Sequence, residues 1–233
     1  MYDAYMYILH IETSTKICSV ALSRDGDLLK YIDHQEGMNH TAILAPSIKM
    51  LLESFELKPK DLRAISVSSG PGSYTGLRVG SSTAKAMTYS LNIPLIAIPT
   101  LSSLAAAAFA RYPEAELALP MLDARRNEVY TSLYNRDMDQ IVTTSSVILE
   151  NSVLFNLIPE DKTVICCGDG AQKLKQQQVL PSNLMVDEEI ECSARHMISL
   201  VQQLLSRGEY SDPMHFVPYY LKPPNITQPG KVR

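Results

Sequence analysis

The sequence predicts an α/β protein with two lobes, each built on a mixed sheet of strands with helices on its faces. Strand-like runs and amphipathic helices alternate along the chain, which favours βαβ units. Each half also contains three short strand-like runs joined by tight turns, and such runs pair antiparallel. The second half repeats this order of elements without repeating the sequence, so we expect two lobes of like topology.

The composition is that of a globular protein. The chain has 233 residues, of which 45% are hydrophobic and 20% are charged, and this excludes disorder as the main state. A chain of this length buries about 70% of its surface on folding, enough for one large domain or two small ones. The 21 basic and 25 acidic residues give a formal charge of -4, and the basic residues are scattered, which disfavours a dedicated nucleic-acid groove.

Apolar runs and cysteines indicate the environment of the protein. The longest apolar runs, such as Ala105–Ala110, fall far short of the roughly 18 residues that a membrane span needs, so we expect no membrane association. The N-terminal run Tyr5–Ile11 is closed by Glu12, so we expect no export signal. The four cysteines show no Cys-x-x-Cys spacing, which favours a reduced, cytoplasmic protein.

The first lobe is expected to span residues 1–100. Apolar residues from Leu44 to Phe55 recur at helical spacing and predict a helix of about 14 residues, with Pro46 in its first turn or at a kink. The other elements expected here are strands over Tyr5–Ile11, Ile17–Leu22, Leu28–Ile32, Ala64–Ser69 and Pro94–Ile98, and a helix over Thr75–Leu91.

The second, smaller lobe is expected to span residues 101–210. We expect helices over Leu101–Ala110, after Gly168-Asp169-Gly170, and from Ser193 to Ser206, and strands over Leu117–Leu122, Val129–Tyr134, Thr163–Cys167 and near Gln140–Thr144, with a further helix before Thr163. Ser193 is a residue type that often caps a helix N-terminus. Residues 211–233 hold five of the 14 prolines and are expected to lie extended on the surface.

The most informative segment is the glycine-rich stretch Gly70–Gly80, which follows a strand and opens a helix. It lacks the lysine of a Walker A loop, the third glycine of a dinucleotide fingerprint and the spacing of a nucleophile elbow. Amides at a helix N-terminus can bind an anion, but a structural turn is the favoured role. We therefore interpret Gly70, Pro71, Gly72 and Ser73 as a structural loop.

Small residues recur along one face of the helix that follows. Gly76, Gly80 and Ala84 are spaced four apart, and each glycine inside a helix costs about 0.5–1 kcal/mol relative to alanine. A close approach to another helix would compensate, and that helix could belong to this chain or to a partner. We predict a partner interface made of these three residues and the apolar stripe of the preceding helix, namely Leu44, Ile48 and Leu52.

Other polar motifs carry weaker signals. His34 and His40 are six residues apart, whereas a helical metal pair needs a spacing of four, so we expect solvated histidines and no metal site. The hairpin around Arg125 and Arg126 is interpreted as a solvated turn. Since no nucleophile has a neighbouring base, we assign no catalytic residue and expect no cofactor. The turn Glu12-Thr13-Ser14-Thr15 resembles the first phosphate loop of actin-like ATPases, although Glu12 stands where an Asp is usual.

Taken together, the motifs are similar to those of one family. The segments are Ile8–Thr15 with Cys18–Leu22, Gly70–Gly80 with Ala84-Lys85, Asp123–Arg126 with Glu128–Tyr130, Gly168–Gly170 and Tyr219–Lys222. In this order they resemble the bacterial TsaB (YeaZ) family over nearly the whole chain. Departures from the family pattern are Glu12 for Asp, Asn127 for Gly and Lys222 where Arg is common.

The resemblance implies a two-lobed actin-like ATPase (ribonuclease H-like) fold with mixed sheets. It also implies a non-catalytic scaffold for making threonylcarbamoyladenosine beside the anticodon of tRNAs, in which Glu12, Thr13, Ser14 and Thr15 form a vestigial phosphate loop at most. The implied partners are the catalytic paralogue TsaD as a heterodimer, the ATPase TsaE in the full complex, and a second copy when the chain is alone. Contact with tRNA would fall mainly to the partner.

Two other classes stay open at this stage. The first is an enzyme, either a nucleotide-dependent kinase of the actin-like superfamily or a glycoprotease. Only one phosphate loop of such a kinase is even partly recognisable here. The second is a direct tRNA-binding module, which conflicts with the net charge of -4 and with the absence of a basic stripe.

Overall fold

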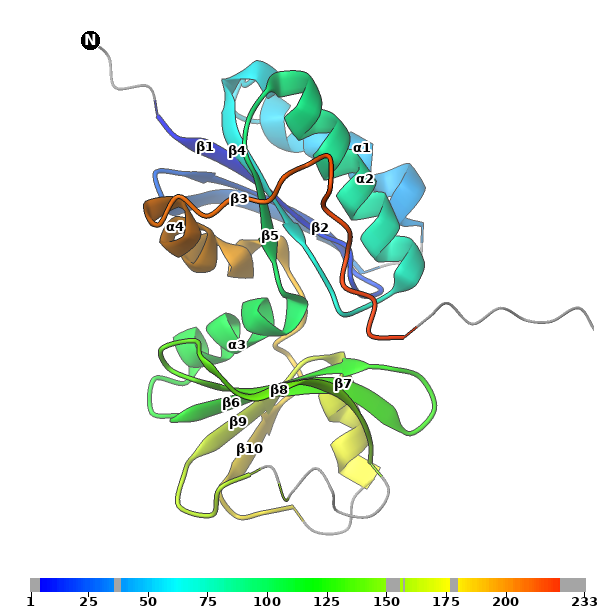
Figure 1. The fold of residues 1–233 in the computed structure, drawn as a ribbon, viewed down its shortest axis with the longest axis vertical. Helices are drawn as coiled ribbons and strands as arrows, with labels where there is room; N and C mark the ends of the chain where they lie inside the picture. Colours follow the sequence, from blue (N-terminus) through cyan, green and yellow to red (C-terminus); the bar gives the residue numbers. More distant parts are fainter. Residues whose placement is uncertain (1–4, 36–38, 150–155, 157, 177–179, 223–233) are drawn as a thin grey trace, which may run out of the picture.

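A computed structural model of the chain describes residues 5–35, 39–149, 156, 158–176 and 180–222. It contains two five-stranded sheets, one in each lobe, with helices packed on both faces of each (Figure 1). The first sheet consists of β1 (Tyr7–Glu12), β2 (Cys18–Arg24), β3 (Asp27–His34), β4 (Leu62–Ser68) and β5 (Leu95–Ile98). The second consists of β6 (Leu117–Asp123), β7 (Glu128–Asn135), β8 (Gln140–Ile148), β9 (Val164–Cys167) and β10 (Leu184–Asp187).

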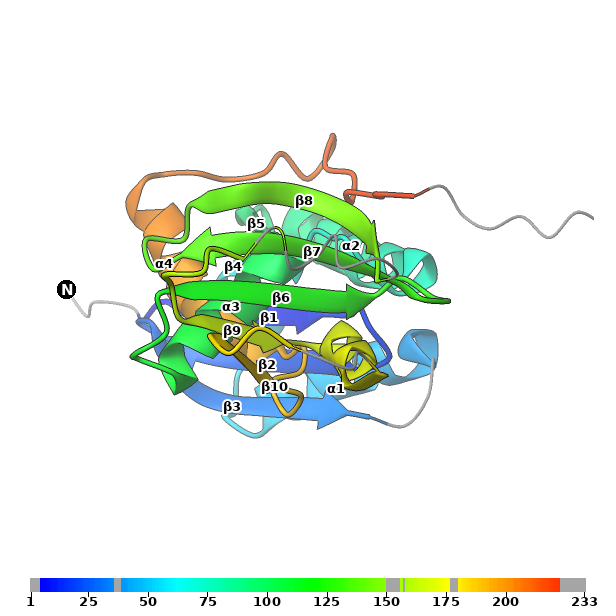
Figure 2. The same ribbon diagram turned by 90° about the horizontal axis from the view of Figure 1, so that it is seen from below.

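The two sheets have the same topology. The first runs β3-β2-β1-β4-β5, with antiparallel pairs among its first three strands and parallel pairs between β1, β4 and β5. The second runs β8-β7-β6-β9-β10 with the same pattern of directions, and Figure 2 shows this order. The mixed-sheet α/β class is therefore confirmed. Strand β10 was not predicted, because its apolar run of three residues, Leu184–Val186, is shorter than the four-residue runs of β5 and β9.

Helices cover the sheets from both sides. They are α1 (His40–Glu53), α2 (Tyr74–Leu91), α3 (Thr100–Arg111) and α4 (Ile198–Ser206), with 3-10 turns η1 (Pro59–Asp61), η3 (Asp169–Gln176) and η4 (Ala194–Met197). In Figure 1, α1 and α2 cover the outer face of the first sheet, whereas α3 and α4 lie between the two sheets. Among the described residues, no helix combines the length and hydrophobicity that crossing a membrane requires.

The alternation of side chains along β1 explains why the first sheet has a core on each face. Leu9 and Ile11 point toward α1 and α2 and join the cluster that contains Leu44. Ile8 points the other way, into a cluster with Met197 and other residues of η4 and α4. All of these side chains are almost completely buried.

Three expectations about the helices need correction. Pro46 lies in the interior of α1, which excludes the first of its two expected positions, the first turn. The helix expected from Ser193 begins as the 3-10 turn η4, and the Ser193 hydroxyl donates to Asp33 Oδ1 at 3.0 Å instead of capping it. Helix α4 packs on the first sheet, although the predicted lobe boundaries assign its residues to the second lobe. The helix expected before Thr163 falls mostly outside the described residues.

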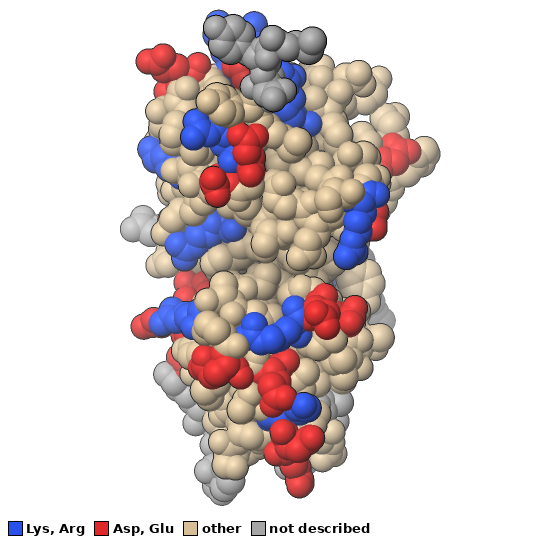
Figure 3. Space-filling model, turned by 90° about the vertical axis from the view of Figure 1, so that its left-hand side faces the viewer, with Lys and Arg blue, Asp and Glu red and all other residues tan. Residues whose placement is uncertain are grey.

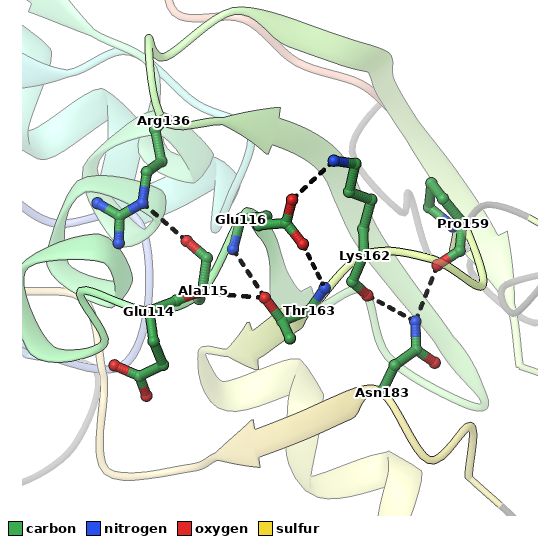
Figure 4. Close-up of polar contacts among 8 residues, drawn as sticks. All are labelled: Glu114, Ala115, Glu116, Arg136, Pro159, Lys162, Thr163 and Asn183. Atoms are coloured by element: carbon green, nitrogen blue, oxygen red, sulfur yellow. Dashed lines mark hydrogen bonds and ion pairs between the residues drawn. The ribbon is translucent and has the colours of Figure 1, made fainter.

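Polar contacts hold together the end of the second lobe where β6 and β9 begin (Figure 4). Glu116 accepts from Lys162 Nζ at 2.7 Å and from the Thr163 amide at 3.1 Å. The Asn183 side chain donates to the carbonyls of Pro159 and Lys162 at 2.8 and 2.7 Å. Loops that are far apart in the sequence are thus joined where the hydrophobic core ends.

A buried histidine lies within the first sheet. His10 on β1 is 2.7 Å from Ser66 Oγ and 2.8 Å from Ser23 Oγ, so both ring nitrogens have partners. Burial lowers the pKa of His10 from 6.5 to about 3. The folded protein therefore holds this ring neutral in a pH range where the unfolded chain would protonate it.

We predict that His10 makes the fold sensitive to acid. Between pH 6.5 and the folded-state pKa only the unfolded chain binds this proton, so His10 should lower the free energy of unfolding by about 1.4 kcal/mol for each pH unit. His10→Gln should remove that slope. Urea unfolding of the unaltered protein and of His10→Gln between pH 7 and pH 5 measures the free energy of unfolding at each pH. The contributions of other titrating groups cancel in the difference between the two proteins. If the free energy of unfolding fell equally with pH in the two proteins, the prediction would be contradicted.

Candidate functional site

The turn that resembles a phosphate loop connects β1 to β2 and lies at the edge of the first sheet that faces the second lobe. The Thr13 amide donates to Ser68 Oγ at 3.3 Å, and the Thr13 hydroxyl donates to the Gly76 carbonyl at 2.9 Å. The Ser14 amide donates to Glu12 Oε1 at 2.6 Å. The two amides and the Thr13 hydroxyl are thus hydrogen-bonded within this chain.

Glu12 is the last residue of β1, at the point where the turn begins. Its side chain is fully buried, and burial raises the pKa of its carboxyl group, with hydrogen bonds from Ser14 acting in the opposite direction. Its Oε2 has no hydrogen-bond partner among the described residues. Its other oxygen, Oε1, accepts the hydrogen bond from the Ser14 amide of the same turn.

The glycine-rich segment fastens this turn to α2. The Ser73 amide donates to the Ser14 carbonyl at 2.6 Å, and Ser73 Oγ accepts from the Gly76 amide at 3.3 Å, which caps the start of α2. The segment therefore holds the β1–β2 turn in place through a backbone hydrogen bond, as the predicted structural role requires.

The prediction that the small-residue stripe faces a partner is wrong. Gly76, Gly80 and Ala84 are all buried in the single chain. A Cβ atom at Gly76 would overlap the Thr13 carbonyl oxygen, and one at Gly80 would overlap Thr13 Oγ1. Both glycines therefore allow α2 to approach the β1–β2 turn of the same chain. The close contact is not with α1 or with a partner helix.

The apolar residues predicted for the same interface also point inward. Leu44, Ile48 and Leu52 are 1%, 6% and 3% exposed and belong to the core between α1 and the first sheet. They could contact a partner only at their edges. The predicted interface residues are core residues, because the apolar stripe of an amphipathic helix packs on its own sheet.

The outer side of the helix pair carries a groove of about 700 Å³ between α1, α2 and residues 56–59. Ile48 and Leu52 contribute to its lining, together with the half-buried Leu57 and Met87. Charged residues at its border are Lys49, Glu53, Glu56 and Lys58. The exposed residues on the outward faces of the helices include the small side chains Ala45, Ser82 and Ala86. This outer surface is what a second helix pair could reach.

The histidines of the first lobe also differ from expectation. His40 is only 4% exposed, and its Nε2 lies 2.9 Å from the Thr15 carbonyl, so it is a buried contact and not a solvated residue. His34 Nε2 lies 2.9 Å from Ser47 Oγ. Within the described part of the chain, no three metal-ligating side chains gather at one point.

The second lobe places its hairpin turn at the same interlobe region. The Asp123 amide donates to Asp169 Oδ1 at 2.9 Å, and Lys173 Nζ lies 2.6 Å from Asp123 Oδ1. Burial raises the pKa of Asp169. Arg125 and Arg126 both adopt positive φ angles, 68° and 47°, at the tip of the turn. On the face shown in Figure 3, basic and acidic side chains are interspersed and do not form a basic stripe.

These features define the class of the protein. Two lobes with the same mixed five-stranded sheet, and with a β-hairpin turn of each directed at the region between them, form the two-lobed actin-like (ribonuclease H-like) fold.

Comparison with known proteins gives the family. YeaZ from Pseudomonas aeruginosa has a similar structure, with a TM-score of 0.78 and 26% identity over 93% of this chain and 100% of that chain. The Bacillus subtilis tRNA threonylcarbamoyladenosine biosynthesis protein TsaB is 37% identical over 175 residues, which are 73% of this chain and 74% of that protein. The Escherichia coli protein of the same name is 28% identical over 93% of this chain and 95% of its own length.

A further match is to the family described as TsaD, tRNA N6-adenosine threonylcarbamoyltransferase, over residues 34–155. That region includes α1 and α2 and extends into the second lobe. The chain belongs to the TsaB (YeaZ) family, as its motifs indicated, and shares part of its fold pattern with TsaD proteins.

We predict that Gly80→Ala destabilises the fold through Thr13. Overpacking of this kind costs about 1–3 kcal/mol. Thr13→Ala removes the hydroxyl that the new methyl group would meet, so in the double variant the two effects should not add. Chemical unfolding of the single and double variants measures the coupling.

Gly76→Ala is the matched control for this cycle. Its methyl group would meet the Thr13 backbone carbonyl, which Thr13→Ala leaves in place, so coupling should be much weaker. Equal coupling at both glycines, or none at Gly80, would show that Thr13 Oγ1 is not the atom that excludes a side chain.

Proposed function

We propose that this protein is a non-catalytic subunit that binds a TsaD protein and supports threonylcarbamoyl transfer to the adenosine beside the anticodon of tRNA. Membership of the TsaB family carries the assignment to this pathway. The match of the TsaD family to residues 34–155 supports a paralogous partner, because two related proteins would each present the equivalents of α1 and α2.

The outer surface of α1 and α2 is the proposed contact. Paired helices of two paralogues can pack as a four-helix bundle, in which small side chains allow the helix axes to approach. Ala45, Ser82 and Ala86 supply small exposed side chains, and the groove beside them offers an apolar floor for a larger side chain of the partner. The contact would thus use the opposite face of α2 from the one that Gly76 and Gly80 form.

The same surface would serve a homodimer when the chain is alone. Because a homodimer and a TsaD heterodimer would cover the same helices, the two assemblies should exclude each other. We further propose that TsaE joins the full complex, that tRNA is held mainly by TsaD, and that the complex works in the cytoplasm.

A nucleotide-dependent enzyme is a weaker alternative. In the turn Glu12–Thr15, the hydroxyl and amides that a phosphate would need are bonded to Glu12, Ser68 and Gly76. This supports a structural role for the turn.

Reconstitution tests the absence of catalysis. We expect that tRNA incubated with this protein, threonine, bicarbonate, ATP and the adenylate-forming enzyme stays unmodified, and that adding TsaD together with TsaE gives modified tRNA. Nucleoside analysis by mass spectrometry measures the product. Threonylcarbamoyladenosine formed at a catalytic rate without TsaD would refute the scaffold role.

The proposed contact predicts that Ala86→Arg abolishes TsaD binding. A long charged side chain buried without a partner between two helices costs several kcal/mol, so affinity should fall about 100-fold or more. Because Ala86 is exposed, the variant should fold normally. Pull-down of TsaD together with circular dichroism of the isolated variant gives the result.

Ala110→Arg provides the matched control, since Ala110 is an exposed alanine on α3. It should bind TsaD like the unaltered protein. If a folded Ala86→Arg protein bound as tightly as this control, the contact would have to lie elsewhere. Gly80→Arg would be a poor test, because it would collide with Thr13 in the chain itself.

A further inference from the structure

The last described residues cross from one lobe to the other. After α4 the chain reaches the edge of the first sheet at Ser211 and then runs along α2 toward the N-terminal end of that helix (Figure 1). At Lys222 it contacts the second lobe. Elsewhere in the described chain, the backbone passes between the lobes at Pro99 and in residues 188–193. We call residues 211–222 the strap.

The strap is fixed to the first lobe at several points. The Ser211 amide donates to the Leu95 carbonyl at 2.8 Å, which extends the edge of β5. Lys85 Nζ on α2 donates to the Phe216 carbonyl at 2.8 Å, and the Phe216 side chain packs against the first core. These contacts give the strap one path along α2.

The final contact with the first lobe is at the glycine-rich segment. The Tyr219 amide donates to the Ser69 carbonyl at 2.7 Å. A Cβ atom at Gly70 would overlap the Tyr219 carbonyl oxygen, and the φ angle of Gly70 is +104°, so only glycine leaves room for the strap here. The ring of Tyr220 lies against that of Tyr74, with centroids 4.8 Å apart.

The strap then contacts the second lobe. Lys222 Nζ forms an ion pair with Glu128 Oε2 at the start of β7, and Glu128 Oε1 accepts from Ser146 on β8. The Glu128 carbonyl accepts from Lys173 at 2.8 Å, so its position is fixed by the second lobe. Only two residues separate Tyr219 from Lys222, and extended backbone covers about 10 Å over that distance.

We propose that the strap is a conformational device that limits how far the two lobes open. It is anchored at Ser69 and Gly70 on one lobe and at Glu128 on the other, and the link between these anchors is so short that a wide hinge motion has to break the Lys222–Glu128 ion pair or the Tyr219–Ser69 hydrogen bond. By holding the lobes together, the strap fixes the orientation of the α1–α2 surface relative to the second lobe. The inference does not depend on the proposed function, because the test uses the chain without a partner.

The first experiment measures the distance between the lobes. Spin labels on Leu28→Cys in the first lobe and Ile141→Cys in the second would react selectively, since all four native cysteines are buried. Tyr219→Pro removes the amide that bonds Ser69, whereas Tyr219→Ala keeps it and is the matched control. We expect the distance distribution to broaden toward longer values in Tyr219→Pro alone.

The second experiment tests the link to the second lobe in a variant that should fold. Lys222→Glu reverses one exposed charge of the ion pair with Glu128, and Lys60→Glu, on the exposed turn η1, is the control. Losing an exposed ion pair should speed hydrogen exchange of the Tyr219 amide by up to about fivefold, equivalent to about 1 kcal/mol. Circular dichroism verifies the fold of every variant.

The proposal fails on either of two results. A Tyr219→Pro distribution as narrow as that of Tyr219→Ala would show that the strap does not restrain the lobes. Exchange of the Tyr219 amide in Lys222→Glu as slow as in Lys60→Glu would show that the contact with Glu128 does not hold the strap.

Discussion

The rest of the first lobe depends on the packing of Thr13 against the α2 backbone at Gly76 and Gly80, where no side chain intervenes. The Thr13 hydroxyl donates to the Gly76 carbonyl, and the side chain fills the space that a Cβ at Gly80 would take. Two glycines inside a helix cost about 0.5–1 kcal/mol each in conformational freedom. The close packing and hydrogen bond gained at Thr13 offset that cost and set how near α2 lies to β1.

This contact decides what the two faces of α2 can do. Its inner face packs against the β1–β2 turn, whose Thr13 amide and hydroxyl and Ser14 amide are hydrogen-bonded within the chain. Its outer face, with Ser82 and Ala86, stays exposed together with the outer residues of α1. The packing at Thr13 thus leaves α2 with one face buried in the chain and one face in contact with solvent.

The second lobe repeats the arrangement with different means. Asp169, at the turn after β9, accepts a hydrogen bond from the Asp123 amide at the end of β6, and the Gly170 backbone lies directly against Leu122. In both lobes, the end of the central strand is thus bonded or packed against the helical element that follows the neighbouring parallel strand, α2 after β4 and η3 after β9. The strap adds a contact with the second lobe at Glu128 to the backbone crossings and to the packing of α3 and α4 between the sheets.

The sequence by itself determined most strands and helices in their order, though not β10 or the 3-10 turn before α4. It also determined the likeness of the two halves and, through the glycine-rich segment, the family. These properties follow from local periodicity and turn chemistry, which neighbouring residues carry. Only the tertiary structure decided which face of α2 is buried, because small residues occur on both sides of the helix and the partner of Gly80, Thr13, is 67 positions earlier in the chain. The burial of His40 against Thr15 and the packing of α4 on the first sheet depend in the same way on distant segments, which no local pattern records.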